Sequence, residues 1–141
     1  LSMQISARNQ ISGTVELIEH GKINAEIFIK LKSGYTLVSV ITNTAANNLN
    51  LEIGDEVVAI FKSSTVLITT DITLNISARN KFQGTVDSIN QDEINTELVI
   101  DIGNNDKIAS VITSSSFERL KIEKGTQVSA IIKASDVIIG K

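Results

Sequence analysis

The sequence consists of one unit written twice. When the chain is shifted by 71 residues against itself, ISARN at 5–9 falls on ISARN at 76–80, and the alignment continues without a gap. Residues 5–70 and 76–141 are identical at 27 of 66 aligned positions. This tandem duplication constrains the fold more than any other feature, because each unit must form the same structure from a short segment.

The two units are joined by a short polar segment, TTDITLN at 69–75. We therefore expect two domains, at residues 3–70 and 74–141, that stay close to each other. A domain of this size buries a modest fraction of its surface and is only marginally stable alone. Since the sequence has no cysteine that could form a stabilising disulfide, we expect the units to pack on each other or on further chains.

Alternating apolar residues predict short strands. Between residues 23 and 31 every second side chain is apolar, which is typical of a half-buried strand. Further strands rich in Val, Ile and Thr are expected at 11–18, 36–42, 56–62 and 65–69.

A short helix is expected at 43–51, capped by Asn43 or Thr44, and another at 114–122 with a serine cap. Five strands and one short helix per unit predict an all-β protein of two tandem OB-type small β-barrels. Half of a β-sandwich has the same pattern and stays open as an alternative.

Composition excludes several kinds of protein. Without cysteine there is no thiolate metal site or cysteine nucleophile, and the single His20 excludes a histidine-rich metal cluster. No apolar segment reaches the ~18–20 residues that span a membrane. Residues 1–15 lack the apolar core of a secretory signal. These features are compatible with a cytoplasmic protein.

Catalytic groups are weakly represented. His20 lies in a turn and is replaced by Gln91 in the second unit, so we interpret it as a solvated turn residue. Glu26 and Glu97 are equivalent and are suited to acid–base chemistry, but each lies on the polar face of a predicted strand and is interpreted as solvated. The GxxxxGK[ST] phosphate loop is absent. We therefore expect no enzymatic activity.

The polar residues that both units share are mostly hydrogen-bond donors. They include Ser6/Ser77, Arg8/Arg79, Asn9/Asn80, Ser39/Ser110, Thr42/Thr113, Lys62/Lys133 and Ser64/Ser135. Such groups suit an oxyanion, because a fully deprotonated tetrahedral dianion offers only acceptors. The alternative, that these side chains fill strand faces or cap helices, fits the sequence equally well.

Four motifs occur in the same order in both units. In the first unit they are SARNQ at 6–10, AEI at 25–27, SVIT at 39–42 and KSSTVLI at 62–68. The motifs resemble those of the Mop domain, a small bacterial molybdate- and tungstate-binding module, and the whole chain resembles a tandem (di-Mop) protein. The resemblance implies OB-type barrels, a homotrimer, and molybdate or tungstate held at contacts between domains or subunits. It also implies storage or homeostasis of the oxyanion without catalysis.

The resemblance also implies which residues bind the oxyanion. The SARN loop and the segment that begins with KS or KA supply Ser6, Ala7, Arg8, Asn9, Lys62, Ser63 and Ser64, with Ser77, Ala78, Arg79, Asn80, Lys133 and Ser135 in the second unit. A second kind of site draws on the SVIT strand, that is, on Ser39, Val40, Ile41 and Thr42, with Ser110, Val111, Ile112 and Thr113. No cation site is implied.

The two units differ within these motifs. Thr65 stands where the family usually has Asp, whereas the second unit keeps Asp136. Ala134 replaces Ser63 and has no hydroxyl to donate, so a site built on the second unit must use a backbone N–H or bind more weakly. Whether Arg8 and Arg79 contact the anion or bridge subunits is left open.

Two alternative functions share the expected fold. A nucleic-acid-binding OB domain needs a basic groove with stacking aromatic residues, but aromatic residues make up 4% of this chain and its net charge is −3. A module that only mediates assembly would have the same fold and would not bind the anion. The sequence favours a cytoplasmic oxyanion-binding protein, with neither nucleic acid nor membrane as a partner.

Overall fold

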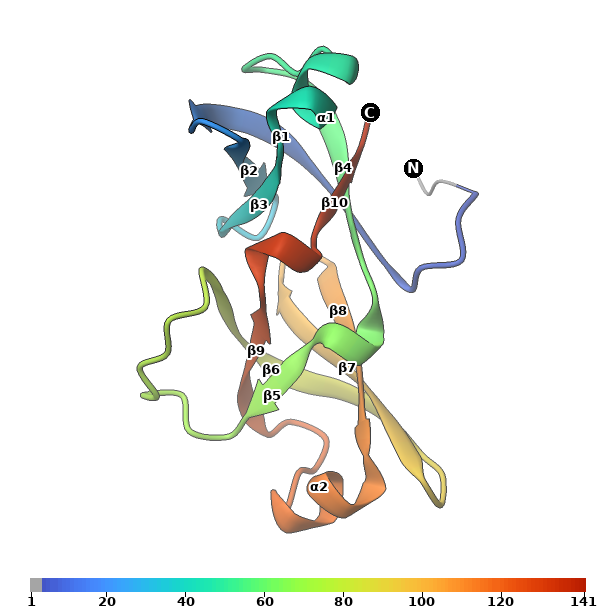
Figure 1. Ribbon diagram of the computed structural model, residues 1–141. Coiled ribbons are helices and arrows are strands. Elements are labelled where there is room, and N and C mark those ends of the chain that lie inside the picture. Colours follow the sequence, from blue (N-terminus) through green and yellow to red (C-terminus); the bar gives the residue numbers. More distant parts are fainter. Residues whose placement is uncertain (1–3) are drawn as a thin grey trace.

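The computed structural model describes residues 4–141, and it contains two five-stranded antiparallel sheets, one above the other in Figure 1. The first sheet has the order β10-β4-β1-β2-β3. Its strands are β1 Asn9–His20, β2 Asn24–Leu31, β3 Thr36–Thr42, β4 Glu56–Phe61 and β10 Ile138–Gly140. The expected domain start at residue 3 lies outside the described residues.

The second sheet has the order β5-β9-β6-β7-β8 and repeats the architecture of the first. Its strands are β5 Leu67–Thr69, β6 Asn80–Gln91, β7 Asn95–Gly103, β8 Asp106–Thr113 and β9 Gln127–Ile132. The prediction of an all-β protein with two OB-type units, each with one short helix, is confirmed.

Each sheet takes its last strand from the other repeat. In the first sheet β10 pairs with β4, Ile138 opposite Ile60, and in the second sheet β5 pairs with β9, Leu67 opposite Ile131. Figure 1 shows both exchanges, with the red β10 rising beside the green β4 and the green β5 lying beside β9. The ranges 3–70 and 74–141 therefore describe the sequence repeat, whereas each sheet is built from residues of both repeats.

The alternation of the strands explains the core. Along β2, Ala25, Ile27, Ile29 and Leu31 point inward and are at most 3% exposed, as strand periodicity requires. A bulge between Val15 and Leu17 in β1 bends this long strand, as such an extra residue does. Strand β1 pairs with β4 before the bulge and with β2 on both sides of it, and the buried side chains of both repeats form one continuous apolar cluster.

The N-caps of the two short helices lie one residue before the first positions predicted for them. Helix α1, Asn43–Asn48, is capped by Thr42, whose hydroxyl accepts a hydrogen bond from Ala45 N. Helix α2, Ser114–Arg119, is capped in the same way by Thr113. The predicted Asn43, Thr44 and serine caps are wrong, because the last residue of the preceding strand has the extended backbone that an N-cap requires. Neither helix in the described chain is long enough to cross a membrane.

Two single-turn 3-10 helices precede the exchanged strands. They are η1 Ser63–Thr65 and η2 Ala134–Asp136, so the strand predicted at 65–69 begins only at Leu67. The segment after each turn is held by a buried serine of the other repeat. Ser39 Oγ donates to Val137 O at 2.7 Å, and Ser110 Oγ donates to Val66 O at 2.8 Å.

Buried asparagines at the start of β1 and β6 join the repeats in a second way. The side chain of Asn80, fully buried, accepts from Val38 N and donates to Val38 O, each at 2.8 Å. The side chain of Asn9 makes the same pair of bonds with Ala109. Each amide therefore acts as an extra backbone unit that extends the other repeat's sheet.

Replacing Asn80 by alanine should lower the free energy of unfolding by about 2–4 kcal/mol, because it removes both bonds and leaves the Val38 N–H and C=O unpaired in the interior. Urea unfolding monitored by circular dichroism measures the change. Asn75→Ala, at an exposed position that precedes the same motif, is the matched control and should change stability by less than about 0.5 kcal/mol. Equal effects of the two substitutions would contradict the structural role of Asn80.

The end of β10 is locked onto the first repeat by an ion pair. Lys141 Nζ lies 3.0 Å from Asp55 Oδ2 and donates to Asn50 O at 2.8 Å. The pKa of Asp55 lies below its ordinary value of 3.8, because its carboxylate accepts hydrogen bonds from the Glu52 backbone and from Lys141. A lowered folded-state pKa stabilises the fold above the unfolded value, and this contribution is lost as the pH falls through the lowered pKa.

We therefore expect Asp55→Asn to be less stable than the parent protein at pH 6 and the difference to shrink as the pH falls below about 4. Urea midpoints of the two proteins across this range measure the effect. Glu52→Gln, whose carboxylate has no bond to Lys141, is the control. A difference that is independent of pH would rule out the ionised carboxylate as its cause.

Candidate functional site

The predicted SARN and KS segments line one groove of about 650 Å³ between the repeats, here called the inter-repeat groove. Its lining consists of Ile5, Ser6, Ala7, Arg8, Ile60, Phe61, Lys62, Ser63, Ser64, Thr65, Ser135, Asp136 and Ile138. The first repeat supplies the loop before β1, the end of β4 and η1, and the second repeat supplies η2 and the start of β10. Strand exchange brings η2 to this place, because β10 must reach β4.

The loop before β1 is held in position by the side chain of Gln10. Its Nε2 donates to Ala7 O at 2.9 Å and to Ile5 O at 3.2 Å. In the second repeat the equivalent residue, Lys81, instead binds the linker before the motif, since its Nζ donates to the backbone carbonyls of Ile72 and Leu74. The residue that follows the motif therefore holds the loop itself in the first repeat and the linker before the loop in the second.

The KS segment offers N–H groups that are not used within the described part of the chain. Within residues 4–141, the backbone N–H groups of Ser63 and Ser64 have no acceptor, and the hydroxyls of the two serines have no hydrogen-bond partner either. Thr65 differs, because its hydroxyl donates to Lys62 O at 2.7 Å. Lys62 stands in extended backbone directly before η1, and its side chain is exposed. These are donors without acceptors, which is what an oxyanion needs.

The arginines of the SARN loops form ion pairs across the repeats. The Arg8 guanidinium binds the Glu97 carboxylate through both terminal nitrogens, and Arg79 pairs with Glu26. Arg79 also lies over the Phe28 ring, 5.8 Å from its centroid. Glu26 and Glu97, interpreted from the sequence as solvated, are therefore structural partners. The arginines bridge the two repeats within one chain, and their charge is already matched by a carboxylate.

The SVIT strands lie outside the inter-repeat groove. Ser39 and Ser110 are fully buried and bind Val137 O and Val66 O, while Thr42 and Thr113 cap the helices. The neighbouring apolar residues of these strands are half-buried: Val40, Ile41, Val111 and Ile112. For these hydroxyls the structure favours the helix-capping and strand-filling alternative that the sequence left open.

The remaining second-repeat residues do not reach the groove that is lined by Ser6 and Lys62. Ser77, Ala78, Arg79 and Lys133 lie at the pseudo-equivalent positions of the other repeat, where Ser77 and Lys133 are exposed. Asn9 and Asn80 are buried beneath their loops. Of the second-repeat set, only Ser135 lines the inter-repeat groove.

Sequence reasoning missed the apolar rim of the groove. Ile5 is 47% exposed and Ile138 is 60% exposed, and both line it. Their signal in the sequence was an apolar side chain directly before or after a polar motif. The sequence shows Asp136 only as a difference between the units, since Thr65 stands at the equivalent position of the first. In the structure Asp136 is an acidic residue that lines the same groove. Among the described residues, no three acidic or histidine side chains gather as a metal site would require.

The tandem OB-type sheets and the paired SARN and KS segments define a known class of protein. The TOBE domain family matches residues 5–68 and again residues 76–139. The chain therefore belongs to the TOBE domain family and carries two such domains in tandem, which confirms the resemblance to di-Mop proteins.

A crystal structure of the cytoplasmic molybdate-binding protein ModG, with molybdate bound, is 40% identical to the chain. The two superpose with a TM-score of 0.94 over 98% of this chain and 99% of that one. The chain is also 36% identical to the molybdenum transport protein ModE of Azotobacter vinelandii over 139 residues, and 36% identical to the molybdenum-pterin-binding protein MopA of Rhodobacter capsulatus over 140 residues.

The lengths of these relatives differ. The matches to ModE and MopA include 99% of this chain. The same matches include only 52% of ModE and 53% of MopA, so the chain spans about half the length of each relative. A probable molybdenum-pterin-binding protein of Haemophilus influenzae matches 66 residues, which are 47% of this chain and 96% of the relative. The unit therefore also occurs singly, as nearly the whole of another protein.

Proposed function

We propose that the chain binds molybdate or tungstate, with one binding site in the inter-repeat groove. The observation that carries the proposal is the meeting of Lys62 with the unpaired N–H and hydroxyl groups of Ser63 and Ser64 beside Ser6. A tetrahedral dianion accepts hydrogen bonds at every oxygen, and charge-assisted bonds of this kind contribute about 1.5–3 kcal/mol each.

The names of the relatives support the ligand. ModG is described as a cytoplasmic molybdate-binding protein and was crystallised with molybdate, and MopA and ModE carry molybdenum in their names. Binding and transport proteins, rather than enzymes, make up this group, and the chain is a binding protein of the same kind. The anion is its ligand and has no catalytic part.

Storage or homeostasis of the oxyanion in the cytoplasm is the role we assign to this binding. We also assign the chain to a homotrimer, in which further subunits complete the anion sites. The open groove and its exposed apolar rim support this assembly, because Ile5 and Ile138 beside a polar site are suited to an interface between subunits. The SVIT strands, whose Val40 and Ile41 are half-buried, remain candidates for sites formed only in the oligomer.

Calorimetric titration of the purified protein with molybdate, tungstate, sulfate and a short single-stranded oligonucleotide tests the proposal. We expect binding of molybdate and tungstate and none of the oligonucleotide. If neither oxyanion binds, the chain is left as a module that only mediates assembly. Sedimentation equilibrium of the same samples measures whether the oligomer is a trimer.

Replacing both Lys62 and Lys133 by alanine should lower molybdate affinity at least about ten-fold or abolish part of the stoichiometry, since each ammonium supplies a charge-assisted bond. Circular dichroism checks that the fold is kept. Lys22→Ala, at an exposed turn position, is the control and should bind normally. Unchanged stoichiometry and affinity in the double variant would remove both lysines from the site.

Asp136 opposes an anion in the inter-repeat groove, because this acidic residue of the second repeat lines the groove together with the donors of the first repeat. Asp136→Asn should therefore raise molybdate affinity by about three- to ten-fold at low salt, with a smaller gain at high salt. The reciprocal variant Thr65→Asp, which introduces the second repeat's residue into the first, should lower affinity. The same titrations measure both variants, and a gain in affinity from Thr65→Asp would contradict this electrostatic account.

A further inference from the structure

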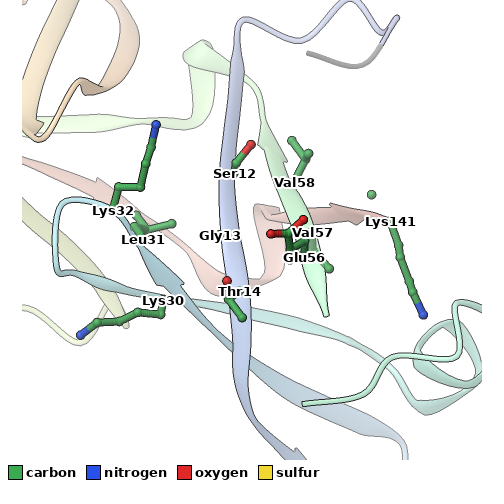
Figure 2. Close-up of a pocket in the computed structure, with 11 residues that line it drawn as sticks. Ser12, Gly13, Thr14, Lys30, Leu31, Lys32, Glu56, Val57, Val58 and Lys141 are labelled. Atoms are coloured by element: carbon green, nitrogen blue, oxygen red, sulfur yellow. The ribbon is translucent and has the colours of Figure 1, made fainter. Parts of the chain in front are cut away.

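A second groove, of about 740 Å³, lies on the first sheet and is here called the lysine groove. It is lined by Ser12, Gly13, Thr14, Lys30, Leu31, Lys32, Glu56, Val57, Val58, Gly140 and Lys141, which belong to or directly follow β1, β2, β4 and β10. Figure 2 shows β1 crossing the groove with Ser12, Gly13 and Thr14, with Lys30 of β2 and Lys32 on one side and Lys141 on the other. No residue of the proposed molybdate site takes part in it.

The equivalent place on the second sheet is filled by a tyrosine. The Tyr35 hydroxyl donates to Gln83 O at 3.0 Å and accepts from Gln83 N at 3.1 Å. Its ring packs on Phe82 with 5.0 Å between the ring centroids. Gln83 lies just before the β6–β7 pairing begins, so the phenol occupies the end of the sheet where β7 no longer covers β6.

Among the described residues, no tyrosine takes the equivalent place on the first sheet. Its residue equivalent to Gln83 is Ser12, which lies directly before the first β1–β2 pair and lines the lysine groove. The residue equivalent to Tyr35 is Asp106, whose shorter side chain instead accepts a hydrogen bond from Ser33 N at 3.0 Å. The same backbone position is therefore capped by a phenol in one repeat and faces a groove in the other.

Charge also distinguishes the lysine groove from the equivalent place on the second sheet. Lys30, Lys32 and Lys141 surround the open groove, and their equivalents in the other repeat are Asp101, Gly103 and Thr70. Lys30 bonds to Gly34 O and Lys141 pairs with Asp55, whereas the Lys32 ammonium has no partner among the described residues. In a chain of net charge −3, the lining of this groove carries three lysines and one acidic residue, Glu56.

We propose that the lysine groove binds a small aromatic anion that carries a phenolic hydroxyl. The hydroxyl repeats the Tyr35 contact at the Ser12 backbone, the ring lies against Leu31, Val57 and Val58, and an acidic substituent pairs with Lys32. A single tetrahedral oxyanion fits less well, because Figure 2 shows the lysine ammonium groups pointing apart rather than toward one point. The apolar floor likewise suits a ring.

Titration of the whole protein with 4-hydroxybenzoate, followed by proton–nitrogen correlation spectra, tests this site. We expect the amide signals of Ser12, Gly13 and Leu31 to shift, and those of the equivalent Gln83, Gly84 and Ile102 to stay in place because Tyr35 fills their groove. Benzoate, which has no hydroxyl, and phenol, which has no charge, should each bind more weakly. Absent shifts at Ser12 and Gly13, equal shifts in both repeats, or equal binding of benzoate would overturn the proposal.

Lys32→Gln should lower the affinity for 4-hydroxybenzoate by about two- to five-fold, as expected for an exposed ion pair. Lys22→Gln is the matched control, because Lys22 is an exposed lysine away from the groove. Molybdate titration of the same variants separates this site from the proposed function, since neither substitution touches the inter-repeat groove. Unchanged affinity in Lys32→Gln would exclude the ion pair and overturn the assignment of an anion.

Discussion

The exchange of the last strand between the repeats is the constraint on which the rest of the structure depends. Without the exchange, β4 in the first sheet and β9 in the second would be edge strands with a row of unpaired N–H and C=O groups. The last strand of the other repeat pairs with that edge, β10 with β4 and β5 with β9. Leu67 and Ile68 fill the second sheet and Ile138 and Ile139 the first, so neither repeat completes its own fold. Each repeat is too small to bury a sufficient core by itself. Together the two repeats share one apolar core.

The polar residues of ISARN follow from this exchange. Asn9 and Asn80 continue the backbone pairing of the opposite repeat, and Arg8 and Arg79 neutralise its glutamates. With these side chains occupied, the donors left for a ligand are those of the KS segment and the serine of the loop. Structure and ligand binding are thus divided between neighbouring residues of one motif, which explains why the motif is written identically in both repeats.

The sequence predicts the strands well because alternation depends on the local period of two, and Ile27 and Ile29 point inward whatever lies elsewhere. It does not predict the exchange, because LI at 67–68 and II at 138–139 fit either sheet equally. The sequence does not predict the ion-pair partners of Arg8 and Arg79 either, because these partners are 89 and 53 residues away along the chain. The Lys62 and Ser63 donors were expected from the motif, whereas the role of Tyr35 has no local signal.

Strand exchange also bears on how the chain folds as it is synthesised. Ile60 of β4 pairs with Ile138, which lies in the last strand of the second repeat. The first sheet therefore keeps an uncovered edge while the entire second repeat is being made, and contacts of such long sequence separation slow folding. Of the two repeats, the one that is synthesised first is therefore completed last, and its open β4 edge is the place where a nascent chain can pair with the wrong strand.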